Sequence, residues 1–139
     1  MVGVVVATHG DLAESLLRTV EGVCGPLERC RAVTVSHVTA IEEARARLAE
    51  AIKAVDDGDG VLVLTDMFGG TPANLALTFL DEKIEVVTGV NLPMLTKLTT
   101  CRTEGAPLRE MAQMLAAYGQ KNITLASELL RARGRPPRG

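Results

Sequence analysis

The chain has 139 residues, is 47% hydrophobic and carries a net charge of −2, which suits one folded domain and excludes a largely disordered protein. Its only aromatic residues are Phe68, Phe79 and Tyr118, so the aromatic platforms that stack single-stranded bases are missing. The slight negative charge also argues against binding of nucleic acid through its phosphates.

Three cysteines without a CxxC pair fit reduced thiols better than a disulfide framework or a zinc site. No group of His, Cys and acidic residues has metal-ligand spacing, and we expect neither a metal nor a cofactor. The apolar run at residues 2–8 is too short for a signal peptide or a membrane span. We therefore expect a cytoplasmic protein.

Short apolar runs alternate with helical patterns along most of the chain. The valine-rich runs at residues 2–8 and 61–64 are typical of strands buried on both faces, as in a parallel sheet covered by helices. Two further strands are expected over residues 31–35 and 84–88. Helices are expected between and after the strands, over residues 11–24, 41–55, 73–80, 94–101 and 107–118. This order predicts an α/β fold built from βαβ units.

Three helix starts carry recognisable capping residues. Asp11 can accept free amides at the first helix, and Thr39-Ala-Ile-Glu42 has the capping-box spacing. Pro72 suits a first helical position behind a Thr71 cap.

The C-terminal region is harder to assign. Ile123 and Leu125 alternate with polar residues, so residues 121–126 can form an edge strand. The segment 131–139 holds four of the 15 basic residues and two prolines, and we expect it to be disordered. The expected organisation is one domain over residues 1–130, with 11 basic and 17 acidic residues, followed by this basic tail.

In open α/β sheets, reactions occur beyond the carboxyl ends of the strands. His9 ends the first expected strand and Asp66 follows the third, so the two side chains can meet. A carboxylate that accepts from Nδ1 fixes the imidazole tautomer and leaves Nε2 as a nucleophile. The second histidine, His37, has no nearby acid or glycine loop, and we interpret it as a surface loop residue.

A glycine loop, Gly69-Gly70-Thr71-Pro72, opens the helix after Asp66. Its glycines let the backbone approach a ligand, and amides at a helix start favour an anion. Gly10 begins another helix directly after His9. Because neither GxxxxGK[ST] nor GxGxxG occurs, the pattern indicates phosphate chemistry on His9 without a nucleotide site.

Three sequence blocks together resemble a known family. They are Val-Val-Val-Ala-Thr-His-Gly ending at Gly10, Thr-Asp-Met-Phe-Gly-Gly-Thr-Pro-Ala-Asn ending at Asn74, and Gly-Val-Asn-Leu-Pro-Met ending at Met94. In order and spacing they are similar to the enzyme IIA domain of the mannose-type (mannose/fructose/sorbose) phosphotransferase system, over about residues 1–127.

The resemblance implies a phosphocarrier in which His9 accepts a phosphoryl group from phospho-HPr and passes it to a IIB subunit. Asp66 would be the partner carboxylate, and Gly10, Phe68, Gly69, Gly70 and Thr71 would surround the phosphate. It also implies a three-layer fold with a mostly parallel five-stranded sheet, helices on both faces and an antiparallel C-terminal edge strand. A homodimer is expected, with membrane contact only through transporter subunits.

Partner docking is expected to use apolar side chains near the site, with Phe68, Leu92 and Met94 as candidates. Since no IIB-like segment follows in the sequence, we expect a separate acceptor protein, and nothing identifies the sugar. One alternative is a regulatory phosphohistidine or a dimerisation module uncoupled from transport. Another is a phosphohistidine phosphatase-like hydrolase, although no arginine that could clamp a phosphate precedes His9. A dihydroxyacetone-kinase phosphocarrier is a further, related alternative, but its loop would not be expected to have the Gly-Gly-Thr-Pro sequence.

Overall fold

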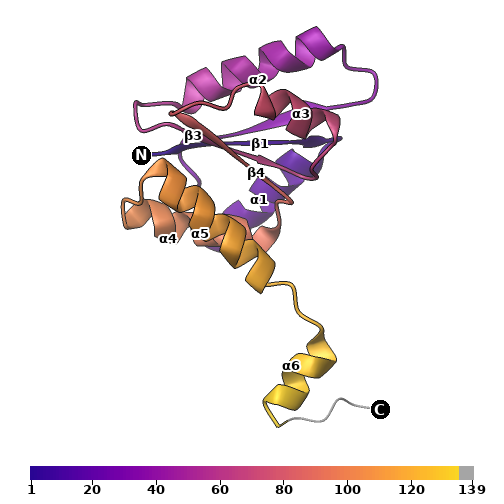
Figure 1. The fold of residues 1–139 in the computed structure, drawn as a ribbon, viewed down its shortest axis with the longest axis vertical. Coiled ribbons are helices and arrows are strands. Elements are labelled where there is room, and N and C mark those ends of the chain that lie inside the picture. Colours follow the sequence, from indigo (N-terminus) through magenta and orange to yellow (C-terminus); the bar gives the residue numbers. More distant parts are fainter. Residues whose placement is uncertain (135–139) are drawn as a thin grey trace.

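A computed structural model describes residues 1–134 and shows a parallel sheet between two layers of helices (Figure 1). Strands and helices alternate through the first four strands, as the sequence predicts, and three helices complete the chain. The elements are β1 (Gly3–His9), α1 (Leu12–Cys24), β2 (Cys30–Val35), α2 (Ile41–Val55), β3 (Val61–Thr65), α3 (Thr71–Leu77), β4 (Ile84–Thr88), α4 (Leu92–Thr103), α5 (Leu108–Lys121) and α6 (Ala126–Ala132).

The strand order is β2-β1-β3-β4, and every neighbouring pair is parallel. The two valine-rich strands, β1 and β3, therefore lie side by side in the centre of the sheet. In the register, Ala7 is paired with Thr65 and His9 with Val35. The carboxyl ends of β2, β1 and β3 consequently meet at one edge of the sheet.

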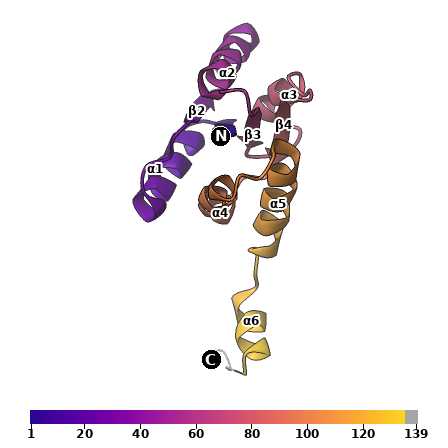
Figure 2. The same cartoon turned by 90° about the vertical axis from the view of Figure 1, so that its left-hand side faces the viewer.

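Successive side chains of the central strands enter two separate cores. Val4 and Val6 pack with α1, α4 and α5, whereas Val5 and Ala7 pack with α2 and α3. Figure 2 shows these layers, with α2 and α3 on one side of the sheet and α1, α4 and α5 on the other. The apolar runs of β1 and β3 are unbroken because helices cover both faces of these strands.

The expectation of a five-stranded sheet with an antiparallel edge strand is wrong for residues 1–134, which form four parallel strands. α5 continues to Lys121, and an irregular stretch leads to α6, which stands away from the body in both views (Figures 1 and 2). Ile123 and Leu125 are 77% and 63% exposed. Their alternation does not produce a strand because no sheet edge lies beside them within residues 1–134.

α6 also crosses the boundary that the sequence suggests between residues 130 and 131, since it ends at Ala132. The tail was expected to be disordered over residues 131–139. Of these, residues 135–139 lie outside the part of the chain that the structure describes.

The helix caps differ from the sequence expectations. At α1 the side chain of Asp11 makes no capping hydrogen bond, and the Thr8 hydroxyl accepts from the Ala13 amide at 2.8 Å instead. At α2 the N-cap is Ala40, while Thr39 bonds to Ser36. At α3 the N-cap is Gly70, so Thr71 is already helical. Only at α1 does another side chain replace the expected cap, because Ala40 and Gly70 make no side-chain capping hydrogen bond.

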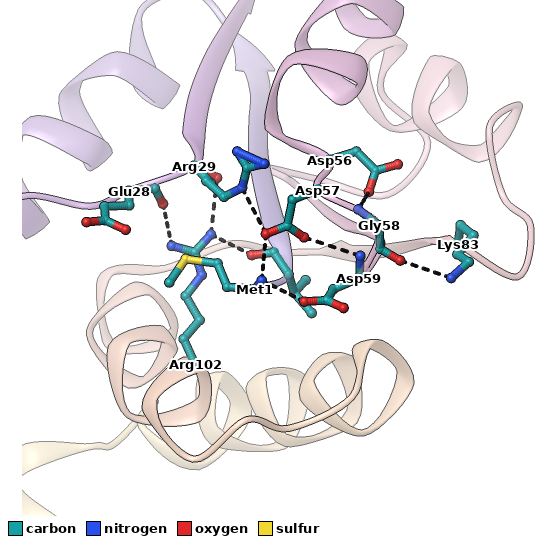
Figure 3. A network of polar contacts seen from close by, with 10 residues as sticks. Met1, Glu28, Arg29, Asp56, Asp57, Gly58, Asp59, Lys83 and Arg102 are labelled. Carbon is teal, nitrogen blue, oxygen red and sulfur yellow. Dashed lines mark hydrogen bonds and ion pairs between the residues drawn. The ribbon is translucent and has the colours of Figure 1, made fainter.

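Arg102 fastens α4 to the amino-terminal edge of the sheet, opposite the strand ends that carry His9 and Asp66. Its guanidinium donates to the carbonyls of Val2, Glu28 and Arg29, with nitrogen–oxygen distances of 2.5 to 3.1 Å (Figure 3). Asp57 lies beside this cluster and accepts from Arg29 Nε at 3.2 Å. The polar contacts that hold this edge are thus separate from the predicted site.

Gly3 provides a test of the close packing between β1 and α2. A Cβ at this position would overlap the carbonyl oxygen of Val55 and approach its Cγ2 to 2.7 Å. We expect Gly3→Ala to lower the free energy of unfolding by about 1–3 kcal/mol, measured by urea denaturation, because backbone must move.

The matched control is Gly22→Ala on the exposed face of α1, where a Cβ meets nothing within 4 Å. This change should raise stability by about 0.5–1 kcal/mol through helix propensity. Equal stability of Gly3→Ala and wild type would contradict the packing described here.

Candidate functional site

His9 and Asp66 lie together at the carboxyl edge of the sheet, as the sequence predicts. His9 is the last residue of β1, and Asp66 directly follows β3, the neighbouring strand. Asp66 Oδ2 accepts from the His9 backbone amide at 3.1 Å and lies 2.8 Å from His9 Nδ1. Two contacts from one residue to one oxygen fix both the backbone and the ring of His9.

The second oxygen of Asp66 accepts from the Met67 amide at 3.1 Å, so the carboxylate is held from both sides. Partial burial raises the pKa of Asp66, but hydrogen bonds from the His9 ring and backbone lower it more. The pKa of this carboxyl therefore lies below its ordinary range. Asp66 is consequently an ionised acceptor at neutral pH.

This geometry fixes the tautomer of the neutral His9 ring. An ionised carboxylate can only accept, so the proton of the imidazole is on Nδ1 and the lone pair is on Nε2. The His9 side chain is 48% exposed, whereas that of Asp66 is 14% exposed. The partly buried carboxylate thus orients a ring that is about half exposed to solvent.

The glycine loop between β3 and α3 packs against this ring. Gly69 has a φ of +88°, a conformation that favours glycine, and the Gly70 amide closes a turn onto the Met67 carbonyl at 3.4 Å. A Cβ on Gly70 would lie 2.5 Å from His9 Cε1 and 3.2 Å from Nε2. Glycine at this position therefore keeps the edge of the ring uncovered.

A hollow of about 380 Å³ opens beside His9. It is bounded by the end of β1, by the loop between β2 and α2 and by the first residue of α3. The lining residues are His9, Val35, Ser36, His37, Thr39, Ile41 and Thr71. The structure therefore brings Thr71 to the site, and it also brings His37, which the sequence analysis left on a surface loop.

Of the three docking candidates, only Phe68 is largely exposed, at 74%. Leu92 is half-buried against the core. The prediction for Met94 is wrong, because this side chain is 2% exposed and packs between α4 and the sheet, where no partner can contact it. The neighbouring Asn91 caps α4 and donates to the Gly119 carbonyl, which is a structural role.

Sequence reasoning missed two residues at this edge. Thr8 is fully buried and caps α1, and His37 faces the same hollow as His9. A usable signal existed for His37, because it follows an expected strand by two residues, and strand ends in one parallel sheet meet at one edge.

Within residues 1–134, no cluster of three or more His, Cys, Asp or Glu side chains could hold a metal ion. In the same part of the chain, no helix has the length and apolar character required to cross a bilayer.

Comparison with known proteins agrees with this arrangement. The family model described as "PTS system fructose IIA component" matches residues 3–116. The fructose-specific EIIA component of Bacillus subtilis is 30% identical over 132 residues, which is 94% of this chain and 90% of that protein. The mannose-specific EIIAB component of Escherichia coli is 32% identical over 128 residues, which is 88% of this chain but 38% of that protein.

A crystal structure of an EIIA component from Streptococcus agalactiae has a TM-score of 0.82 and 25% identity, with 92% of this chain and 99% of that chain covered. The fold and these matches define a IIA component of the phosphotransferase system. The chain belongs to the mannose-type IIA family. It is accordingly a phosphotransferase that acts as a phosphocarrier in a sugar phosphotransferase system.

Whether Asp66 is ionised in the folded protein can be tested by measuring the free energy of unfolding as a function of pH. Because its folded pKa is lowered, Asp66 contributes stability that is complete above its unfolded pKa of about 3.9 and is lost as pH falls through the folded value. We expect Asp66→Asn to be less stable than wild type at pH 7 by about 1–2 kcal/mol in urea titrations. The difference should shrink as the pH is lowered below about 4. A difference that is constant between pH 7 and pH 3 would contradict the ionised pairing.

The role of Gly70 can be tested by measuring how fast a reagent modifies the His9 ring. Its backbone angles suit alanine, so Gly70→Ala should fold normally and act only by pushing the ring. We expect diethyl pyrocarbonate to modify His9 more slowly in this variant, because the added methyl group crowds Cε1 and Nε2, the edge of the ring that the reagent attacks. Gly22→Ala is the control. Modification at the wild-type rate would show that Gly70 is not needed for the ring geometry.

Proposed function

We propose that His9 is the phosphoryl-carrying residue, that phospho-HPr is the donor and that a IIB protein is the acceptor. The observation that supports this assignment is the 2.8 Å contact between His9 Nδ1 and Asp66, which leaves a lone pair on Nε2 of a ring that is 48% exposed. The other histidine, His37, has no such carboxylate among its hydrogen-bond partners within residues 1–134.

The proposed step is an in-line exchange between two imidazoles. The Nε2 lone pair of His9 attacks phosphorus, an N–P bond forms, and the N–P bond to the donor histidine breaks with its electron pair going to the donor nitrogen. The His9 ring gains positive charge during attack, and the Asp66 carboxylate 2.8 Å from Nδ1 stabilises it. Transfer to the acceptor repeats this exchange in reverse.

The surrounding loops support the negative charge of the phosphoryl group without a fixed cation. Thr71 is exposed in the hollow beside His9, and its hydroxyl can donate to a phosphoryl oxygen. The Gly10 amide already donates to the Val35 carbonyl and the Gly70 amide to the Met67 carbonyl. The Gly69–Gly70 turn still brings backbone close to the ring, where the Gly69 amide can act similarly. Phosphoryl transfer depends mainly on such alignment and charge stabilisation, so few side chains are required.

Docking is assigned to an apolar rim, which we define as Val38, Ile41, Met67 and Phe68. All four are exposed. Val38 and Ile41 belong to the start of α2 and its preceding loop, and Met67 and Phe68 belong to the loop after β3. These segments flank His9 because β1 lies between β2 and β3. Exposed apolar residues around a polar centre suit transient protein–protein contacts.

We further propose that the protein works in the cytoplasm as a homodimer. The stretch from Ile123 to Leu129 exposes three large apolar side chains outside the body of the domain, namely Ile123, Leu125 and Leu129. A second copy would bury them. The proposal names no sugar, because a IIA component handles only the phosphoryl group.

The test is reconstitution with phosphoenolpyruvate, enzyme I and HPr, followed by detection of an acid-labile, base-stable phosphate. We expect one phosphoryl group per chain in the wild type and none in His9→Gln, whose amide keeps a polar side chain but has no nucleophile. Asp66→Asn should accept phosphate about 10- to 100-fold more slowly, because the charged hydrogen bond is lost.

Addition of a purified IIB protein should discharge the labelled wild type. Label that persists in His9→Gln would move the site elsewhere, and wild type that is never labelled by phospho-HPr would exclude this donor. Label that forms but is not passed to any IIB protein would favour a regulatory role for the phosphohistidine.

A further inference from the structure

His37 lies close to His9 because of the sheet register. His9 is paired with Val35 of β2, and the Gly10 amide donates to the Val35 carbonyl at 3.1 Å. His37 is two residues beyond Val35, so it belongs to the loop that rises directly beside the phosphate-accepting ring. Both imidazoles line the same hollow of about 380 Å³.

The loop that carries His37 is held in a defined turn. The Ser36 and Thr39 hydroxyls are 2.9 Å apart, the Ser36 amide donates to Thr39 Oγ1 at 3.2 Å, and the Thr39 amide donates to the Ser36 carbonyl at 3.1 Å. These contacts hold the turn together and use one of the two hydroxyl protons. His37, one of the two residues between them, has no hydrogen bond from its side chain within residues 1–134 and keeps its ring nitrogens for another ligand.

A phosphoryl group in this hollow would be stabilised by a hydrogen-bond donor on the side opposite Asp66. A phosphoryl dianion on Nε2 of His9 would lie near the ionised Asp66, and these like charges repel. Among the described residues that line the hollow, none is Lys or Arg. The side-chain groups left to donate are the Thr71 hydroxyl, one hydroxyl of the Ser36–Thr39 pair and the His37 imidazole. Of these, only the imidazole can also carry a positive charge.

We propose that His37 is a phosphate-binding residue, whose imidazole N–H donates to a phosphoryl oxygen when the group is bound to Nε2 of His9. The proposal rests on the proposed function, because it needs His9 as the phosphorylated residue. It assigns to this chain a contact that stabilises the phosphorylated state from the side of β2, whereas Asp66 acts from the side of β3.

The first experiment does not depend on HPr. Phosphoramidate transfers its phosphoryl group to imidazole nitrogen and releases ammonia, so it can label His9 directly. Since the chain has two histidines, protein labelled with ¹⁵N in histidine gives only two sets of imidazole resonances. We expect phosphorylation of His9 to shift the ring resonances of His37 as well, which a purely structural residue would not show.

The second experiment measures the equilibrium constant for transfer from phospho-HPr. His37→Ala should lower it about tenfold, which corresponds to about 1.4 kcal/mol for one exposed charge-assisted hydrogen bond. His37→Gln, which keeps an N–H donor, should retain most of the wild-type value. Gly22→Ala is the control, because this position on the exposed face of α1 lies outside both the hollow and the apolar rim.

The outcomes separate the two proposals. His37 resonances that stay in place while those of His9 shift, or a His37→Ala equilibrium equal to wild type, would overturn the role of His37. Failure of phospho-HPr to label a protein that phosphoramidate does label would contradict the proposed donor, and the resonance shift would still decide the role of His37. Phosphoramidate labelling that leaves His9 unmodified would overturn both.

Discussion

The contact between His9 and Asp66 sets the conditions that the rest of the site has to meet. One carboxylate oxygen receives both the backbone amide and the ring nitrogen of His9, and the other receives the amide of Met67. A short side chain such as aspartate can reach both groups only if the two residues end neighbouring strands at the same level. The parallel register of β1 and β3 places the ends of the two strands side by side. A register shifted by one residue would turn the Asp66 side chain to the other face of the sheet.

The sheet in turn is held by features remote from the chemistry. Its two central strands are buried on both faces, and Arg102 ties α4 to three carbonyls at the opposite edge. The carboxyl edge therefore does not have to supply most of the stability, and it can present an exposed ring, a glycine turn and apolar side chains. Burying these groups for stability would close the site to a partner, so the separation of the two edges is what allows a small domain to be both stable and accessible.

The sequence predicts the central sheet well because doubly buried strands leave an unmistakable valine pattern, and the strand ends then bring His9 and Asp66 together. It fails where the outcome depends on a neighbour distant in the chain. Residues 121–126 have a strand-like alternation but no strand beside them, and the Met94 side chain finds the core instead of the surface. The same limit applies to His37, whose position is informative only once β2 is known to lie next to β1.

The absence of lysine and arginine from the residues lining the described hollow fits the task of a relay. A carrier has to accept a phosphoryl group from one protein and release it to another, so its phosphorylated state cannot be much more stable than those of its partners. Guanidinium groups bind phosphate through two parallel charged hydrogen bonds and would hold it too firmly. Hydroxyls, backbone amides and one imidazole, which bind more weakly, can align the group for attack and still let it leave. A site of this composition favours passage of the phosphoryl group over its retention.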